Sequence, residues 1–376
     1  MIKVLSIVGT RPEIIKMAPV IQQLQKTSSI VSQVCTTSQH RTMQDQMMQL
    51  FGLKADYDLD VMKPNQDLFY LTSEMLVRLQ SVLQQAKPDL VLVQGDTTTS
   101  FVGALAAFYC QIPVGHVEAG LRTHNLLAPF PEEANRQLTG RLVTMHFAPT
   151  ETSKRHLLQE GVAENRIWVT GNTVIDALLW MRQHLNLNRI KAALPGNILQ
   201  LIEQQKPYVL ITGHRRENFG EGFLSICRAI QILATRYPKW NFVYPVHLNP
   251  NVRKPVFDLL AGYANIHLIE PVDYEPFVHL MDHCKIVLTD SGGVQEEAPS
   301  LGKPVLVMRE VTERPEGIEA GTAKLVGTAE ATLIAAVSEL IDDPLAYQRM
   351  ANAVNPYGDG TAAQQIVNHI TGHLLL

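Results

Sequence analysis

Short apolar runs alternate along the chain with longer stretches whose apolar residues recur every three or four positions. Apolar runs bounded by turn residues are typical of buried parallel strands, and the longer spacing is typical of helices. The alternation breaks once and then resumes, so it predicts two series of strands. The strands expected in the first series are 2–8, 31–37, 90–94, 113–118 and 166–170, and those in the second are 208–212, 241–245, 266–269, 286–289, 305–308 and 323–326.

Helices are expected between these strands. The clearest follows Asp67, a favourable N-cap, and ends before Pro88. Alternating strands and helices predict an α/β fold with a doubly wound parallel sheet in each of two Rossmann-like domains and a cleft between them. The expected domains are residues 1–171 and 172–360, with a last helix, 361–376, that packs back onto the first. The other predicted helices are 39–51, 100–110, 131–145, 174–185 and 294–301, and the polar stretch 186–206 is expected to be an irregular connection.

Length and composition agree with a two-domain protein. The chain has 376 residues, too many for one ordinary core. A net charge of −4 argues against a nucleic-acid binder, and we expect neither a bilayer-spanning segment nor a signal peptide. The four cysteines, at positions 35, 110, 227 and 284, are far apart and have no metal-binding spacing. They indicate a reduced, cytoplasmic protein.

The stretch 286–301 predicts an anion site. A buried strand is followed by a turn with two glycines, Gly292 and Gly293, and then by a helix. The free N–H groups of a first helical turn suit a phosphate, and Ser291 adds a hydroxyl donor. Glu297, one helical turn further on, suits the two hydroxyls of a ribose. The alternative is a plain glycine turn with a solvated glutamate.

The first strand is followed by a second candidate anion site. Gly9 has no further glycines at the spacing of a dinucleotide fingerprint, so an NAD site is not expected. Arg11 and Lys16 instead flank the helix start, where two cations suit a diphosphate. Considered alone, these two residues are more simply explained as solvated charges.

Three carboxylates follow strands of the first domain or begin its helices. These are Asp96, Glu118 and Glu132. Each has an ordinary alternative role: a helix N-cap for Asp96, an exposed strand end for Glu118, and a first-turn acid favoured by the helix dipole for Glu132. Together they predict an acid cluster at the mouth of one sheet, where neighbouring acids raise one another's pKa and can carry protons near neutral pH.

The second domain has cationic loops at the corresponding edge. The segment 214–218 starts with His214 and Arg215, and Arg314 follows a later strand. Phe277 is a candidate for stacking on a base, although a core phenylalanine is the commoner case. Solvated loops are again the alternative.

The chain resembles the non-hydrolysing UDP-N-acetylglucosamine 2-epimerase family. The similarity runs in order along nearly the whole chain and includes a Gly-Thr-Arg-Pro-Glu segment and an Asp-Ser-Gly-Gly-Val-Gln-Glu-Glu segment. The matching segments are 9–13, 95–98, 116–122, 131–136, 213–218, 244–250 and 290–297.

The resemblance implies a GT-B fold, a homodimer, and reversible conversion of UDP-GlcNAc into UDP-ManNAc for bacterial surface polysaccharide, without NAD or a required metal. Asp96, Glu118, Glu132 and His214 match the catalytic set. The implied substrate contacts are Arg11, Lys16, Asp96, Glu118, His214, Val272, Phe277, Ser291, Gly292, Gly293, Glu297 and Arg314.

Some members of the family bind a second UDP-GlcNAc beside the active site and are activated by it. Residues Gln39, Glu132, Arg215 and His247 match that second site. Thr42 and Asn65 stand where those members have longer polar or cationic side chains. The resemblance therefore implies a possible allosteric site.

The chemistry of the substrate narrows the mechanism. The C2 proton of the sugar is next to no carbonyl, oxidation would need NAD, and the bond from C1 to UDP blocks ring opening. The route that remains is elimination of UDP to give 2-acetamidoglucal, with positive charge developing on the sugar ring as in glycosidases. The other functions considered are a hydrolysing 2-epimerase that releases ManNAc, a GT-B glycosyltransferase, and a non-enzymatic sensor of UDP-sugars.

Overall fold

The computed structural model describes residues 1–37, 41–63 and 66–374, and it divides into two compact units. Unit 1 comprises Met1–Ala177 and Tyr357–Leu376, and unit 2 comprises Leu178–Pro356. The division falls a few residues from the boundaries expected at 171/172 and 360/361. The first boundary lies inside helix α7 (Thr173–Gln183), where the sequence has no linker composition.

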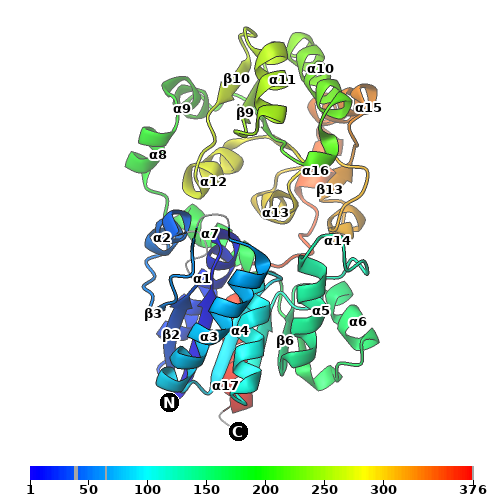
Figure 1. Cartoon of the computed structure of the whole chain (residues 1–376). Helices are drawn as coiled ribbons and strands as arrows, with labels where there is room; N and C mark the ends of the chain where they lie inside the picture. Colours follow the sequence, from blue (N-terminus) through cyan, green and yellow to red (C-terminus); the bar gives the residue numbers. More distant parts are fainter. Residues whose placement is uncertain (38–40, 64–65, 375–376) are drawn as a thin grey trace. The chain divides into compact units, whose positions relative to one another are not determined.

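Unit 1 is built on a seven-stranded parallel sheet with the order β3-β2-β1-β4-β5-β6-β7 (Figure 1). The order reverses between β1 and β4, so the loops after these strands leave the same edge of the sheet and diverge. The strands are β1 (Ile2–Val8), β2 (Ile30–Thr36), β3 (Tyr57–Asp58), β4 (Leu90–Gln94), β5 (Val114–Val117), β6 (Met145–Ala148) and β7 (Ile167–Val169).

The helices of unit 1 cover both faces of this sheet. Helix α1 (Arg11–Lys26) begins with a capping box, in which Thr10 and Glu13 each accept a backbone N–H of the other residue. The last helix, α17 (Ala362–Leu374), packs on α1, and the backbone N–H of Ala363 donates to Asp176 at 2.8 Å. The other helices are α2 (Arg41–Leu50), α3 (Leu68–Ala86), α4 (Thr98–Tyr109), α5 (Glu132–Leu142) and α6 (Glu151–Gln159).

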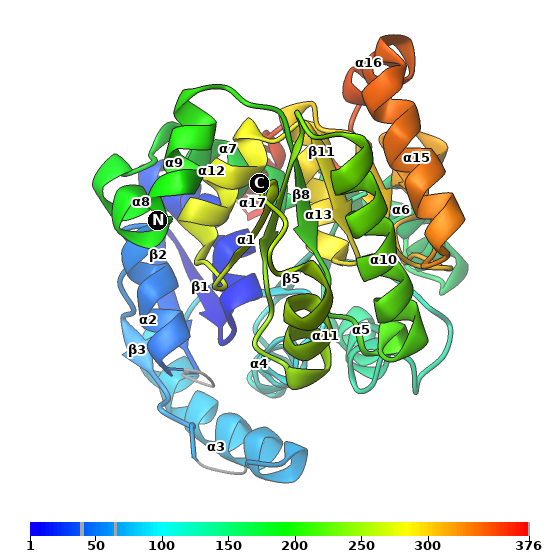
Figure 2. The ribbon, with the colours of Figure 1, turned by 90° about the horizontal axis from the view of Figure 1, so that it is seen from above.

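Unit 2 repeats the plan with a six-stranded parallel sheet in the order β10-β9-β8-β11-β12-β13. Its core is formed where aliphatic strand residues meet the apolar faces of α10 (Glu221–Arg236) and α15 (Glu330–Asp342). Helices α10 and α11 (Pro250–Leu260) lie side by side in Figure 2. The strands are β8 (Tyr208–Thr212), β9 (Asn241–Pro245), β10 (Ile266–Ile269), β11 (Ile286–Thr289), β12 (Val305–Val307) and β13 (Ala323–Leu325).

The remaining helices of unit 2 are short. Helix α13 (Gly292–Glu297) continues as a 3₁₀ helix over Ala298–Leu301, which closes on Gly302 in the left-handed region. The others are α8 (Leu187–Ala193), α9 (Gly196–Glu203), α12 (Tyr274–His283), α14 (Pro315–Glu319) and α16 (Pro344–Ala351). Two parallel α/β sheets with Rossmann-type strand orders confirm the predicted GT-B fold class.

Three expectations about individual elements were wrong. The helix expected over 131–145 ends at Leu142, and Met145–Ala148 forms β6, because the run is short and contains a histidine that masks its apolar character. Helix α6 was not expected. The stretch 186–206 is not irregular but contains α8 and α9, whose buried faces present only a few apolar residues such as Ile190, Ile198 and Leu201.

Candidate active site

Glu118 is a carboxylate of unit 1 that three neighbouring side chains hold in place. It follows β5 with a φ of 65°, a backbone conformation that a glutamate rarely adopts, and its side chain is 5% exposed. Nζ of Lys16 lies 2.6 and 2.7 Å from its two oxygens. The side-chain amides of Gln94 and Asn172 also donate to it, the latter at 3.2 Å. The exposed strand end considered from the sequence is therefore wrong, and Lys16 contacts this carboxylate.

Asp96 is oriented by a different cation. Its carboxylate accepts from Nε and Nη2 of Arg136, at 2.8 and 2.7 Å, and its carbonyl accepts from the amide of Asn135 at 2.9 Å. The N-cap of α4 is not Asp96 but Thr97, whose hydroxyl accepts the N–H of Ser100. The capping role is thus excluded, and the carboxylate of Asp96 is presented by α5 through Arg136.

Glu132 and Glu133 begin the same helix and differ in environment. Glu132 is half-buried in the first turn of α5, where the dipole favours an acid. Glu133 is buried and accepts from Arg136 at 3.2 Å and from the N–H of Thr123 at 3.0 Å. Burial opposes its ionisation, but hydrogen bonds from Gln137, Thr123 and Arg136 hold its pKa below the usual value. Glu133 was not among the predicted site residues, although its spacing of three residues from Arg136 is a helical ion-pair signal.

Glu13 joins two loops of the same sheet edge. Its oxygens accept from the backbone N–H groups of Gly9 and Thr10, at 3.0 and 2.6 Å, and from the hydroxyl of Thr97 at 2.6 Å. Burial raises the pKa of this carboxyl to about 6, against the effect of these bonds. The contact fixes the loop that carries Arg11, half-buried at the first position of α1, next to the loop that carries Asp96.

The glycine turn of unit 2 lies against a cation. Ser291 is the N-cap residue of α13 but its hydroxyl makes no capping bond, so this hydroxyl is not used by the helix. A Cβ at Gly292 would come 3.6 Å from Cζ of Arg314, whereas one at Gly293 would meet nothing within 4 Å. Arg314 is held by Glu296, with Nε 2.7 Å from the carboxylate oxygen. The guanidinium therefore lies over the turn, as an anion site requires.

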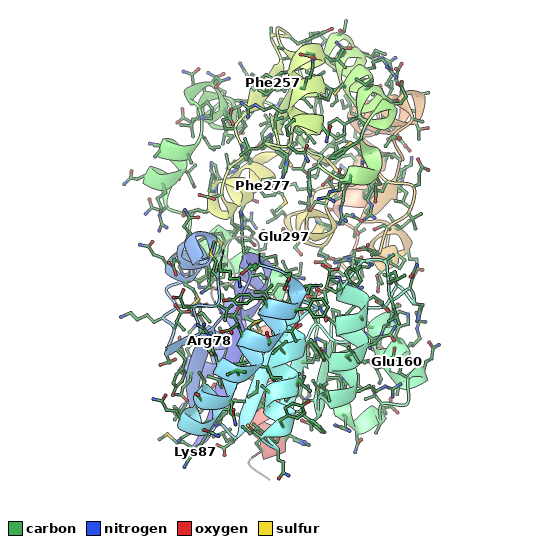
Figure 3. The ribbon with its side chains drawn as sticks, in the orientation of Figure 1. Arg78, Lys87, Glu160, Phe257, Phe277 and Glu297 are labelled. Atoms are coloured by element: carbon green, nitrogen blue, oxygen red, sulfur yellow. The ribbon has the colours of Figure 1, made fainter. Side chains whose placement is uncertain are left out.

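Glu297 is buried rather than solvated. Its Oε1 accepts from the hydroxyl of Tyr274 at 2.8 Å, so a neighbouring side chain fixes the carboxylate. Phe277, one turn further along α12, is half-buried, and Val272 precedes that helix. Figure 3 shows Phe277 on α12 and Glu297 on α13.

His214 lies in the loop after β8, and its side chain is 43% exposed. Its ring stacks on that of His247 with 5.4 Å between centroids. Partial burial lowers the pKa of His214, while the neighbouring carboxylate of Asp290 acts in the opposite direction and the charges of His247 and Arg215 lower it further. The residues that match a second UDP-GlcNAc site do not all belong to one unit. Arg215 and His247 belong to unit 2, Glu132 belongs to unit 1, and Gln39 lies outside the described residues.

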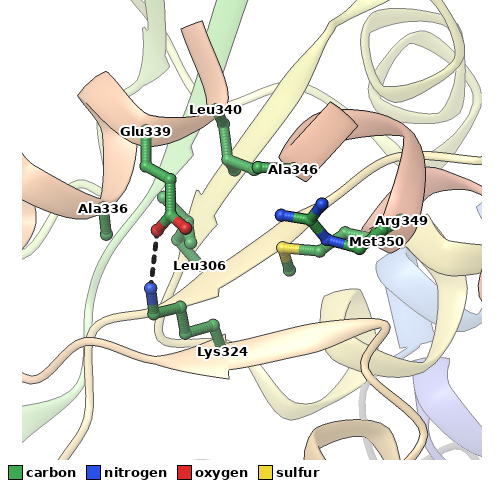
Figure 4. A pocket seen from close by; sticks show the side chains of 8 residues that line it. All are labelled: Leu306, Lys324, Ala336, Glu339, Leu340, Ala346, Arg349 and Met350. Atoms are coloured by element: carbon green, nitrogen blue, oxygen red, sulfur yellow. Dashed lines mark hydrogen bonds and ion pairs between the residues drawn. The ribbon is translucent and has the colours of Figure 1, made fainter. Parts of the chain in front are cut away.

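Unit 2 also contains a small pocket, apart from the residues described above. A pocket of about 100 Å³ lies between β12, β13, α15 and α16, and the ion pair of Lys324 with Glu339 crosses it (Figure 4). It is smaller than the roughly 300–1,000 Å³ of ordinary ligand sites. The searched residues contain no group of three His, Cys, Asp or Glu side chains placed to hold a metal. Nor do they include a helix with the length and apolarity needed to span a membrane.

Two Rossmann-like units with charged groups at the carboxyl ends of their parallel sheets define an α/β protein of the GT-B class. Residues 22–371 match the family model described as UDP-N-acetylglucosamine 2-epimerase. The UDP-N-acetylglucosamine 2-epimerase of Escherichia coli K12 is 54% identical over 366 residues, covering 97% of both chains. The chain belongs to the UDP-N-acetylglucosamine 2-epimerase family.

Solved structures agree. That of the UDP-GlcNAc 2-epimerase from Neisseria meningitidis bound to UDP-GlcNAc has a TM-score of 0.86 at 54% identity and covers 99% of this chain and 100% of that one. A putative UDP-N-acetylglucosamine 2-epimerase from Listeria monocytogenes has a TM-score of 0.92 at 46% identity, covering 99% and 96%. The similarity therefore extends over both units.

Proposed function

We propose that this chain reversibly converts UDP-GlcNAc into UDP-ManNAc by eliminating UDP and adding it back. The observation that carries the proposal is Glu118, a buried carboxylate at the end of β5 that Lys16, Gln94 and Asn172 hold in one orientation. A carboxylate fixed by three neighbours is placed to move a proton, whereas a site that only binds a sugar has no need of it. Family membership supplies the substrate class.

The reaction conserves all atoms without a further reactant. The C1–O bond breaks, UDP leaves with the electron pair, and a carboxylate removes the C2 proton to give the C1=C2 double bond of 2-acetamidoglucal. UDP then returns to C1 while a proton is added to the other face of C2. Asp96, Glu118 and Glu132 supply the acid and base groups for these steps, and His214 is the fourth member of the set.

Unit 2 provides the groups for the leaving UDP. Arg314, the hydroxyl of Ser291 and the backbone of Gly292 and Gly293 stabilise the diphosphate as negative charge grows on it. Glu297, oriented by Tyr274, accepts from the ribose hydroxyls. Phe277 and Val272 contact the base in this proposal. Arg11 and Lys16 bind the diphosphate, and Lys16 exchanges part of its pairing with Glu118 for the substrate.

Incubation with UDP-GlcNAc alone in deuterated water, followed by NMR, tests the proposal. We expect UDP-ManNAc with deuterium at C2, because the proton removed from one face is replaced from solvent on the other. Epimerised product without deuterium would contradict elimination with proton exchange. Free ManNAc and UDP as main products would assign the chain to the hydrolysing reaction, and turnover that requires an acceptor would assign it to glycosyl transfer.

The cellular role follows from the product. UDP-ManNAc formed in the cytoplasm supplies ManNAc units for bacterial surface polysaccharide. Growth of a strain that lacks the gene tests this role, because its surface polysaccharide should lose ManNAc-derived sugars and regain them when the gene is restored. Complementation by the Glu118→Gln variant should fail.

The chain acts as a homodimer in this proposal, and one face of unit 1 supports the assignment. Helices α3 and α4 pack together, and a depression of about 310 Å³ lies on them. Val77 and Tyr109 are each 66% exposed there. Light scattering should give the mass of two chains, and Val77→Glu should reduce it to one. Leu345→Glu, at a position with the same exposure in unit 2, should leave the mass unchanged.

A second UDP-GlcNAc activates the enzyme in the same proposal. Arg215 and His247, which flank His214, would contribute to its site together with Gln39 and Glu132. Activation predicts a sigmoidal dependence of the rate on UDP-GlcNAc and slow conversion of UDP-ManNAc supplied alone. A hyperbolic dependence with full activity toward either sugar would contradict it.

A further inference from the structure

Asp290 makes more contacts with the His214 loop than a turn residue needs. It follows β11 directly and is completely buried. One carboxylate oxygen, Oδ2, accepts from the backbone N–H groups of His214 and Arg215, both at 2.8 Å, and from the amide of Asn218 at 3.3 Å. A single oxygen atom thus anchors the start and the end of the loop.

The other oxygen of Asp290 faces the imidazole. Oδ1 lies 3.5 Å from Nδ1 of His214, is buried, and accepts no hydrogen bond. At this distance the pair is just beyond a good hydrogen bond. Such bonds between working groups are often long before the substrate binds and shorten afterwards. A buried carboxylate oxygen beside a ring nitrogen favours a proton on that nitrogen.

The sheet explains why these two residues meet. Strands β8 and β11 pair in register, with Thr212 opposite Thr289, and the hydroxyls of these threonines are 2.5 Å apart. The N–H of Asp290 continues the ladder by donating to the carbonyl of Thr212 at 3.1 Å. The next residues on the neighbouring strand are Gly213 and His214, so the register brings the carboxylate to the loop.

We propose that Asp290 is a positioning residue for His214: it anchors the loop through Oδ2 and, through Oδ1, keeps the imidazole proton on Nδ1, which leaves Nε2 as the working nitrogen. Isolated neutral histidine prefers the opposite tautomer, with the proton on Nε2. An Nδ1–H tautomer at His214 therefore distinguishes it from a histidine without such a neighbour. The role goes beyond the family's substrate contacts and rests on the proposed function only for its kinetic consequence.

The other charged groups near the ring act against protonation. Arg215 follows in the same loop, and His247 stacks on the ring from the loop after β9. Nδ1 of His247 lies 3.1 Å from the backbone N–H of Asn249 and accepts it, so His247 presents Nε2–H when neutral. Among the groups that act on His214, the carboxylate of Asp290 alone raises its pKa.

Two-bond ¹H–¹⁵N NMR of the full-length protein labelled at histidine nitrogen reads the tautomer directly. The His214 signals are assigned by their loss in His214→Gln. We expect the Nδ1–H pattern at a pH above the pKa of His214. An Nε2–H pattern in the wild type would overturn the proposal, and this reading needs neither turnover nor a variant of Asp290.

Asp290→Asn provides the second test. The amide oxygen can still accept from the loop, but the NH₂ now faces Nδ1 and favours the Nε2–H tautomer. We expect kcat to fall about tenfold to a thousandfold with a smaller change in the affinity for UDP. The limb of the pH–rate profile that depends on His214 should move to lower pH by about one unit, because the raising charge is lost.

Asn218→Ala is the matched control, since it removes a neutral donor to the same carboxylate and keeps the charge. It should lower stability without changing the tautomer or the position of the pH limb. If Asp290→Asn and Asn218→Ala both lowered kcat with an unchanged tautomer and pH limb, Asp290 would be a loop anchor only and the proposal would be wrong. If the Nδ1–H tautomer were found in a protein that does not epimerise UDP-GlcNAc, the proposed function would fail and the positioning role would stand.

Discussion

The two units use charge in opposite ways at the carboxyl ends of their sheets. In unit 1 cations support carboxylates, because Lys16 holds Glu118 and Arg136 holds Asp96. In unit 2 the roles are exchanged and carboxylates support other groups. Glu296 pairs with Arg314, and Asp290 accepts hydrogen bonds from the loop that carries His214.

In the proposed function this reversal corresponds to the groups that each unit offers to the substrate. A buried charge is costly unless a partner neutralises it. Each charged group that faces the substrate, called a presented group below, therefore needs a neighbour of opposite charge, called its supporter. Proton transfer at C2 calls for presented acids, and departure of UDP calls for presented cations and N–H donors. In the proposed function the same fold serves both purposes, because unit 1 offers carboxylates held by cations and unit 2 offers a cation held by a carboxylate.

The largest effect is expected from removing the presented acid of unit 1. Glu118→Gln should lower turnover about 10²- to 10⁴-fold, because a carboxamide cannot take the C2 proton. Initial rates with UDP-GlcNAc measure this. Glu160→Gln is the matched control, since Glu160 pairs with Arg122 at 2.6 Å in the same unit and is not assigned to the reaction. Similar losses in both variants would mean that the ion pairs are structural and would remove the distinction between presented and supporting acids.

The next effect concerns the presented cation of unit 2. Arg314→Ala should weaken UDP binding about tenfold to a hundredfold, because a charged hydrogen bond is worth about 1.5–3 kcal/mol. Titration calorimetry with UDP measures it. Arg253→Ala removes an exposed arginine that pairs with Glu270 at 2.6 Å, and it should leave the affinity unchanged. An unaltered affinity in Arg314→Ala would show that the backbone turn suffices without its cation.

Glu13 is a buried carboxylate of unit 1 that accepts from uncharged donors, whereas Glu118 and Asp96 are paired with cations. It therefore tests what a buried acid does without a charged supporter. Burial raises its pKa from 4.5 to about 6, so the folded protein holds this proton more tightly than the unfolded chain. The stabilisation from the bound proton is complete below pH 4.5 and is lost as the pH rises through about 6. Glu13→Gln stays neutral throughout. Its amide oxygen can accept from the N–H groups of Gly9 and Thr10, and its NH₂ can donate to the hydroxyl of Thr97.

The free energy of unfolding of the wild type should therefore fall relative to that of Glu13→Gln by about 2 kcal/mol between pH 4.5 and 7. Urea unfolding at the two pH values measures the difference. Asp176, whose pKa burial also raises to about 6, contributes equally to both proteins. Parallel stability curves for the two proteins would show that Glu13 is ionised without penalty.

The smallest effect is expected from a neutral supporter. Tyr274→Phe removes the hydroxyl that orients Glu297 but leaves the carboxylate in place. UDP affinity should fall about three- to fivefold, less than the loss in Glu297→Ala, because only the orientation of the acceptor is affected. Calorimetry with UDP and with inorganic pyrophosphate, which has no ribose, separates the ribose contact from the phosphate contacts. Equal losses for both ligands would remove Glu297 from the ribose site.

Much of the fold was predictable from local pattern. The strands 208–212, 241–245, 266–269 and 286–289 were predicted with the bounds that the structure has, because each is a short apolar run between turn residues. The motifs at strand ends were also recognisable, since phosphate-binding turns and first-turn acids depend on adjacent residues. Strand β6 was missed because His146, buried opposite His116, makes a buried strand look polar.

The supporting contacts could not be read from the sequence, because they join residues far apart in the chain. Lys16 and Glu118 are 102 residues apart, and Asp290 and His214 are 76 apart. Whether a lysine at a helix start meets a phosphate or a carboxylate depends on which strand ends beside it, and the strand order decides that. The sequence by itself determined the elements, the class of fold and the kinds of group available. Only the tertiary structure decided which carboxylates are presented and which are supporters, because burial and pairing arise when the sheets assemble.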